Sequence, residues 1–199
     1  MKIKVCGMSN ATQNQAILHC DQVDFLGTIQ FSQSPRYFPR ELNTAIPTIG
    51  VFVNETRDAI ISKSEAFNLS GIQLHGNETP ELCSSLPKHL TVIKAFAIGA
   101  IGDFEKTAAY DGHVDYFLFD TATTNYGGSG RKFNWDLLEH YTGITPFFLS
   151  GGIAPEDIDA LSQLKHECMT GIDINSRFEL EPCIKDSAAV LTFIQQLKS

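Results

Sequence analysis

Two residues of the sequence could serve as a base and an acid, and each directly follows a run of apolar residues. Cys6 follows Val5 near the start of the chain, and Asp120 follows the apolar residues 116–119. A thiol acts as a general base only when nearby positive charge lowers its pKa, ordinarily about 8.5. A carboxyl group beside an apolar wall has a raised pKa and can hold a proton near neutral pH. The pair predicts acid–base chemistry, although a buried structural thiol and a turn or cap aspartate fit the same residues.

Small and polar residues in the last third of the chain could bind a phosphate group. Gly151 and Gly152 follow one apolar run, and Asn175 and Ser176 follow the next. Backbone N–H groups beside glycines and at the start of short helices are common phosphate donors. Ser176 and Glu179 also have the spacing of a capping box, which predicts a short helix beginning at this point. Together the two segments predict a phosphate site.

Three further features could contact an anionic ligand. Arg36 follows Pro35 and could pair with a carboxylate, although a solvated loop arginine is the commoner case. His75 ends another apolar run and could bind a substrate or a backbone group. The glycine-rich residues 127–130, which include Gly128, could form a lid or a flexible connection. No Gly-Lys-Ser/Thr loop and no GxGxxG fingerprint occurs, so neither common nucleotide motif is present.

Eight short runs of apolar, β-branched and aromatic residues recur along the chain and predict strands. Several runs are apolar at consecutive positions, which is typical of a parallel sheet covered on both faces. The predicted strands span residues 3–6, 25–31, 48–53, 71–75, 91–96, 116–120, 146–150 and 171–174.

Signals for helix starts lie between these runs. Asn54, Thr79 and Asn134 are candidate N-cap residues, and Pro80 and Pro155 stand at first-turn positions. The last helix is predicted over residues 185–198, with its apolar face at positions 188, 191, 194 and 197.

The alternation of eight strands with helices predicts an α/β fold, a single (β/α)8 TIM barrel over residues 1–199. An open doubly wound sheet is the alternative architecture. In a barrel of this kind the functional groups lie just beyond the carboxyl ends of the strands. The candidate acid, base and ligand-binding residues all stand at the ends of predicted strands or in the segments that follow, so the barrel would bring them to one end.

The composition excludes several classes of protein. The chain has 199 residues, of which 43% are hydrophobic, enough for a buried core. Its net charge of −8 disfavours a nucleic-acid partner. No apolar run approaches the ~20 residues of a membrane span, and the first ten residues are unlike a secretory signal, so no membrane association is expected. The five widely spaced cysteines include no CxxC pair, which predicts neither a metal site nor a disulfide framework and favours the cytoplasm.

Taken in order, the motifs resemble those of the phosphoribosylanthranilate isomerase family of tryptophan biosynthesis. The resemblance covers almost the whole chain and implies a barrel of the ribulose-phosphate-binding type that requires no metal or organic cofactor. The motifs are KVCGM at 4–8, SPRY at 34–37, GVFVN at 50–54, QLHG at 73–76, LFDT at 118–121, GGSG at 127–130, LSGGI at 149–153 and DINS at 173–176.

The resemblance implies an Amadori rearrangement of a small anionic phosphosugar. N-(5′-phosphoribosyl)anthranilate would become 1-(2-carboxyphenylamino)-1-deoxyribulose 5-phosphate, and the enzyme would be a monomer or a homodimer. Cys6 would be the general base, Asp120 the general acid, and Arg36 would hold the anthranilate carboxylate. The other expected substrate-binding residues are His75, Gly128, Gly151, Gly152, Asn175, Ser176 and Arg177.

The sequence departs from the family pattern at three positions, and two other functions remain open. Arg177 and Cys183 each stand where a glycine is usual, and Gln30 stands where an aromatic residue is common. Arg177 could add a cationic contact to the phosphate or simply face outward. Lys94, inside the fifth run, keeps open a phosphosugar barrel of the indole-glycerol-phosphate synthase kind. A non-catalytic barrel that binds a phosphate ligand is the second alternative.

Overall fold

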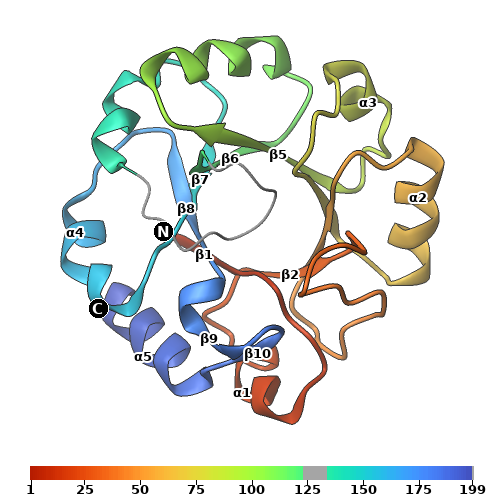
Figure 1. The fold of residues 1–199 in the computed structure, drawn as a ribbon, viewed down its shortest axis with the longest axis vertical. Helices are drawn as coiled ribbons and strands as arrows, with labels where there is room; N and C mark the ends of the chain where they lie inside the picture. Colours follow the sequence, from red (N-terminus) through yellow and green to blue (C-terminus); the bar gives the residue numbers. More distant parts are fainter. Residues whose placement is uncertain (123–133, 199) are drawn as a thin grey trace.

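The computed structural model describes residues 1–122 and 134–198, and its eight principal strands close into a parallel barrel (Figure 1). The strands follow one another around the barrel in sequence order, and β8 pairs with β1 to complete it. Each predicted run overlaps one strand, so the predicted TIM barrel is confirmed. The strands are β1 (Lys2–Val5), β2 (Phe25–Ile29), β3 (Thr48–Phe52), β4 (Gly71–Leu74), β5 (Thr91–Ile98), β6 (Tyr116–Thr121), β7 (Phe147–Leu149) and β8 (Met169–Ile174).

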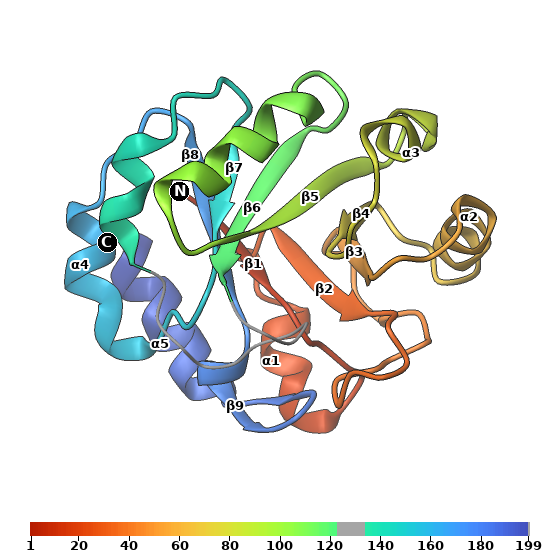
Figure 2. The same cartoon turned by 45° about the horizontal axis from the view of Figure 1, so that its top comes forward.

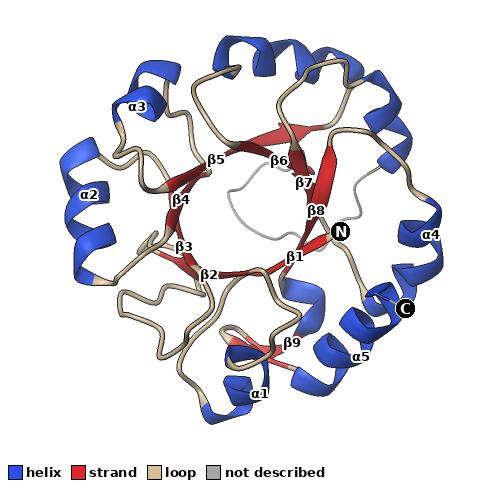
Figure 3. Ribbon diagram, turned by 180° about the vertical axis from the view of Figure 1, so that it is seen from behind, coloured by secondary structure: helices blue, strands red, loops and turns tan. Residues whose placement is uncertain are grey.

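Helices surround the barrel on the outside, as Figure 3 shows. The connection between β2 and β3, residues 30–47, contains no helix, so the predicted alternation is wrong at this place. Pro35, Pro39 and Pro47 lie in or at the end of this connection, and proline lacks the N–H that a helix interior needs. The α-helices are α1 (Gln15–Leu18), α2 (Arg57–Ala66), α3 (Pro80–Ser85), α4 (Ile158–Gln163) and α5 (Ser187–Lys198), and the 3₁₀ helices are Thr12–Asn14, Ile101–Tyr110, Trp135–His140, Pro155–Asp157 and Ser176–Phe178.

The predicted helix caps are right at two positions and wrong at one. The side chains of Thr79 and Asn134 accept backbone N–H groups at the starts of α3 and of the 3₁₀ helix Trp135–His140. Thr56, not Asn54, caps α2. Asn54 has a positive φ of 53° and its side chain accepts the N–H of Asn77, so a contact with the next loop replaces the cap.

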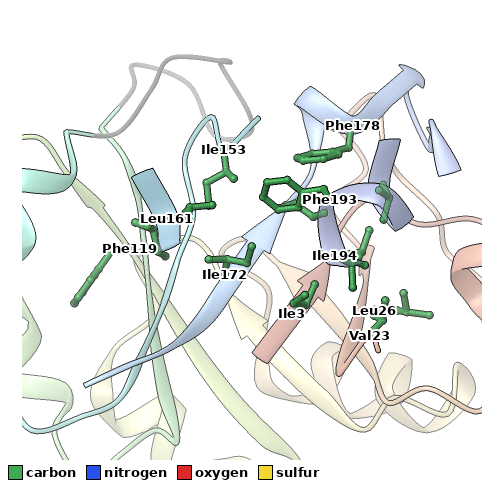
Figure 4. Packing of buried hydrophobic residues seen from close by; sticks show 14 of the residues in the cluster. Ile3, Val23, Leu26, Phe119, Ile153, Leu161, Ile172, Phe178, Phe193 and Ile194 are labelled. Carbon is green, nitrogen blue, oxygen red and sulfur yellow. The ribbon is translucent and has the colours of Figure 1, made fainter. Parts of the chain in front are cut away.

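The buried face of the last helix matches the predicted one only in part, since Ile194 is buried and Leu197 packs against the core. α5 begins at Ser187, and its buried residues are Val190, Phe193 and Ile194, whereas Ala188 is exposed. Residues three apart drift by about 60° per step around an α-helix, so the predicted set does not share one face. Figure 4 shows Phe193 beneath Phe178, and their ring centroids lie 5.0 Å apart.

The core is divided between the barrel interior and the layer between strands and helices. The interior is filled by Ile49, Ile93, Ala95, Leu118 and Phe148. The outer layer packs strand side chains such as Ile3 and Ile172 against α4 and α5 (Figure 4). Because successive strand residues alternate between these two layers, every second residue of a strand faces the interior.

The carboxyl ends of the strands lie on one side of the molecule. In the oblique view of Figure 2, the arrows of β2 and β6 point toward the side that carries β9. β9 (Glu179–Glu181) pairs with β10 (Ile184–Lys185) in a small antiparallel ribbon beside α1 and α5 (Figure 1). Only Asn175 and the 3₁₀ helix Ser176–Phe178 separate this ribbon from β8, so it lies close to the expected functional end.

Candidate active site

A pocket of about 780 Å³, partly open to solvent, lies at the carboxyl ends of the strands. Its lining includes the candidate base, the candidate acid and six of the expected substrate-binding residues. The barrel therefore brings together side chains that are distributed over the length of the chain. The lining residues are Cys6, Ile29, Phe31, Ser34, Arg36, Val51, Val53, Gln73, His75, Asp120, Ser150, Gly151, Gly152, Ile153, Asp173, Asn175 and Ser176.

Two expected binding residues are not placed in this pocket. Arg177 is exposed and does not line it. Gly128, with the rest of the glycine-rich segment 127–130, lies outside the described residues.

The short helix expected after β8 is present as the 3₁₀ helix Ser176–Phe178, but the prediction of a capping box between Ser176 and Glu179 is wrong. Asn175 takes the N-cap position and makes no side-chain cap bond. The carboxylate of Glu179 binds Arg36 and Lys185 instead. A tertiary ion pair has thus replaced the local bond that the spacing predicted.

Cys6 lies just beyond the end of β1, two residues after Lys4. Side chains two residues apart point to the same side of a strand, and both Lys4 and Cys6 point into the barrel interior. Its N–H donates to the carbonyl of Ile174, which continues the pairing of β1 with β8. Gly27, on β2, leaves the space for the thiol, because a Cβ there would stand 2.7 Å from the Cys6 Sγ. The chain turns away at Gly7, which has a positive φ of 69°.

A buried ion pair lies beneath the thiol. The Lys4 Nζ is 2.9 Å from Asp173 Oδ2, and the two residues are paired neighbours in β1 and β8. Asp173 lines the pocket, and its Oδ1 has no hydrogen-bond partner among the described residues. Both residues stand in the motifs, but the sequence did not predict the pair. A charged residue at an interior position of an apolar strand was the available signal.

The surroundings of Cys6 act on its pKa in opposite directions. Burial raises the pKa of the thiol, while the positive charges of Lys4 and Lys185 lower it. The expected positive charge is present, but burial outweighs it and the pKa of Cys6 is raised overall. The surroundings therefore favour the thiol over the thiolate more than solvent would.

Asp120 follows Leu118 by two residues on the interior face of β6. Burial raises the pKa of its carboxyl group, as predicted, against the opposing effect of the Thr121 N–H, which donates to Oδ1 at 2.7 Å. Gly151, with φ of 90°, packs closely here, because a Cβ on it would approach Asp120 Oδ1 to 3.0 Å. The carboxyl group accordingly keeps its proton to a higher pH than an exposed aspartate does.

His75 lies beside the candidate acid. Its Nε2 is 3.6 Å from Asp120 Oδ2. Burial, followed by the positive charge of Lys94, lowers the pKa of His75 to about 4, so the ring is neutral at pH 7 and the contact is not an ion pair. Gln73 Nε2 lies 2.9 Å from Nδ1, and with Gln73 as the donor the ring proton is on Nε2, facing Asp120.

Arg36 and Lys94 differ in their relation to the pocket. Arg36 lines it and forms an ion pair with Glu179, its Nη2 lying 2.7 Å from Oε2. Lys94 does not line it. The Lys94 Nζ pairs with Glu78 at 3.3 Å and donates to the carbonyl of Gly76 at 2.7 Å. Lys94 thus forms its ion pair outside the cavity. It no longer supports the alternative function of an indole-glycerol-phosphate synthase.

Residues 1–122 and 134–198 contain neither a metal-binding cluster nor a membrane-spanning helix. Within them, no three His, Cys, Asp or Glu side chains are grouped so that they could hold a metal ion. The helices of the same residues include none with the length and apolar character needed to cross a membrane.

Comparison with known proteins agrees with the geometry of the pocket. A family model described as N-(5′-phosphoribosyl)anthranilate (PRA) isomerase matches residues 3–196. N-(5′-phosphoribosyl)anthranilate isomerases of Phocaeicola vulgatus and Parabacteroides distasonis are 50% and 44% identical, covering 100% and 99% of this chain and 98% and 93% of theirs. A phosphoribosyl anthranilate isomerase solved in complex with reduced 1-(o-carboxyphenylamino)-1-deoxyribulose 5-phosphate is 26% identical, with a TM-score of 0.80 over 100% of this chain and 98% of that one. The chain therefore belongs to the phosphoribosylanthranilate isomerase family.

Proposed function

We propose that this chain catalyses the Amadori rearrangement of N-(5′-phosphoribosyl)anthranilate in tryptophan biosynthesis, with residues 1–199 as a single catalytic domain. The observation that carries the proposal is the shared pocket of Cys6 and Asp120 in a chain of this family. We further propose that the enzyme works in the cytoplasm as a monomer or a homodimer.

Asp120 acts first, as the general acid. Its raised pKa lets it carry the proton that it donates to the furanose ring oxygen. The bond between C1′ and this oxygen breaks, and the lone pair of the anthranilate nitrogen forms the C=N bond of a protonated Schiff base. The neutral His75, 3.6 Å away, adds no positive charge that would favour ionisation of the acid.

Cys6 acts second, as the general base. Its thiolate removes the C2′ proton, the electrons of that C–H bond form the C1′=C2′ bond, and the π electrons of the C1′=N bond return to the nitrogen. The resulting enolamine tautomerises to the ketone. Lys4 and Lys185 supply the positive charge that favours the thiolate in a buried site. The acid must be protonated and the base must be ionised in the same cavity, and this opposition is characteristic of paired proton-transfer groups.

The remaining lining residues bind the two ends of the substrate. Arg36 pairs with the anthranilate carboxylate, to which a planar guanidinium is well matched. At the other end, the backbone of the Gly151–Gly152 and Asn175–Ser176 segments binds the phosphate. His75 contacts the sugar near the acid. Gly128 and Arg177 stay predictions without a described contact to the pocket.

A turnover assay tests the proposal. The purified protein is mixed with an excess of N-(5′-phosphoribosyl)anthranilate, and product is separated by chromatography. We expect many product molecules per protein molecule. A signal limited to one bound substrate per protein, with no product, would contradict catalysis and favour the binding barrel.

A further inference from the structure

A cluster of three charged side chains lies at the edge of the pocket, formed by Arg36, Glu179 and Lys185. Glu179 is its centre, because Oε2 binds Arg36 and Oε1 lies 2.8 Å from the Lys185 Nζ. The carboxylate is nearly buried, at 4% exposure, and Lys185 is fully buried. Arg36 lines the pocket, whereas Glu179 and Lys185 lie behind it. On the basis of the proposed function, we propose that Glu179 is a positioning residue that presents Arg36 to the carboxylate of the substrate.

The contact geometry leaves one edge of the guanidinium for a second carboxylate. Glu179 Oε2 accepts from Arg36 Nε at 2.8 Å and lies 2.7 Å from Nη2. Arginine carries five donors in a rigid plane, so these contacts use the Nε edge and leave the edge formed by Nη1 and Nη2. Because Glu179 fixes the guanidinium plane at its Nε edge, the edge formed by Nη1 and Nη2 also has a fixed orientation. The long arginine side chain is therefore ordered before the substrate arrives, which reduces the entropy lost on binding.

The same cluster connects Arg36 to the expected phosphate end of the site. The Lys185 Nζ donates to Asn175 Oδ1 at 2.7 Å, and Asn175 lines the pocket directly after β8. Gly7, which follows the candidate base, packs against Asn175, Arg36 and Glu179. A Cβ on it would stand 2.5 Å from Asn175 Oδ1, 3.1 Å from Arg36 Cδ and 3.2 Å from Glu179 Oε1. Glu179 thus holds the carboxylate-binding arginine in fixed relation to the base and to the phosphate loop.

The charges of the cluster also suit an anionic ligand. Two cations, Arg36 and Lys185, share the single negative charge of Glu179, which leaves one unit of positive charge beside the pocket. This local charge matters in a chain with a net charge of −8. Removing the charge of Glu179 would make the cluster more positive, so electrostatic attraction alone predicts tighter substrate binding. Loss of positioning predicts weaker binding, and the two effects have opposite signs.

Glu179→Gln separates these effects, and Glu181→Gln is the matched control. Glu181 belongs to the same ribbon but is exposed and does not line the pocket. We expect Glu179→Gln to raise KM roughly two- to tenfold, the effect of losing one pre-ordered long side chain. We expect kcat to stay within about twofold, because a carboxylate remote from C1′ and C2′ is bound equally in the ground and transition states. Glu181→Gln should match the wild type in both constants.

A double variant tests whether Glu179 acts through Arg36. In an Arg36→Ala background, adding Glu179→Gln should change KM little, because the group that Glu179 positions is gone. A KM that is unchanged or lower in Glu179→Gln, or an equal rise of KM in the Arg36→Ala background, would overturn the proposal. So would a loss of kcat that parallels a fall in the thermal midpoint.

Two further controls keep the outcome interpretable. Should Glu179→Gln fail to fold, Glu179→Asp replaces it, since this variant keeps the charge and shortens the reach by one methylene. It should raise KM in the same way, and an unchanged KM would again overturn the proposal. Absence of turnover in the wild type and in Glu181→Gln would refute the proposed function itself, an outcome distinct from a failure confined to Glu179.

Discussion

Replacing Gly27 with alanine should displace the Cys6 thiol while leaving the substrate-binding groups in place. The new Cβ would stand 2.7 Å from Cys6 Sγ, 3.1 Å from its Cα and 3.2 Å from its Cβ, against an ordinary contact of 3.4–4 Å. The thiol, or the strand that carries it, must therefore move by about 0.7 Å to restore an ordinary contact. A misplacement of about 1 Å in a catalytic group can lower the rate by about 10²-fold. We expect kcat to fall by about that factor, with KM within about threefold of the wild type.

The assay is steady-state turnover of the purified Gly27→Ala protein, with Gly102→Ala as the control. A Cβ on Gly102 would meet no atom within 4 Å, so this substitution should leave kcat and KM unchanged. Thermal unfolding of both variants monitors the fold, since overpacking at Gly27 should reduce the free energy of unfolding by about 1–3 kcal/mol. A folded Gly27→Ala protein with the kcat of the wild type would refute the inference that the position of the Cys6 thiol limits catalysis.

Three further predictions concern the acid, the base and the lysine beneath the base. Cys6→Ala and Asp120→Asn should each retain the fold and lower kcat by about 10²–10⁴-fold; near-normal turnover in either would contradict the role of that residue. Because burial raises the pKa of both groups, kcat/KM should depend on pH as a bell whose two limbs lie above the ordinary values of a carboxyl and a thiol, and limbs at or below those values would refute this electrostatic account. Lys4→Met removes a charge that lowers the pKa of Cys6, so the thiol should be alkylated more slowly at pH 8, as read by mass spectrometry of the Cys6 peptide; an unchanged rate would contradict the effect of Lys4. The same substitution leaves Asp173 buried and unpaired, which should lower the free energy of unfolding by about 3–5 kcal/mol.

The barrel could be predicted from the sequence because its strands are covered on both faces. Runs such as 116–119 and 147–149 are apolar at consecutive positions. That pattern can be recognised in the local sequence without knowing which strands pair with each other. The positions of Cys6 and Asp120 could be predicted as well, because each stands at the carboxyl end of a predicted strand. The functional residue at the end of an individual strand could thus be predicted from the local sequence.

Contacts between distant segments could not be predicted in this way. Lys4 and Asp173 are 169 residues apart in the sequence and meet only because β8 pairs with β1 in one register. Glu179 has the local spacing of a capping residue, but the ion pair with Arg36, 143 residues away in sequence, takes its carboxylate. At both sites the partner of the charged side chain is determined by the three-dimensional arrangement of distant segments. That arrangement cannot be read from the local sequence.

The most direct test of the account is a crystal structure of this protein with reduced 1-(o-carboxyphenylamino)-1-deoxyribulose 5-phosphate. We predict that Cys6 Sγ lies about 3–3.5 Å from C2′ of the ligand and that the Asp120 carboxyl group lies within hydrogen-bond reach of the oxygen that closes the furanose ring. A ligand that fills the pocket while either group points away from its sugar would contradict the assignment of acid and base.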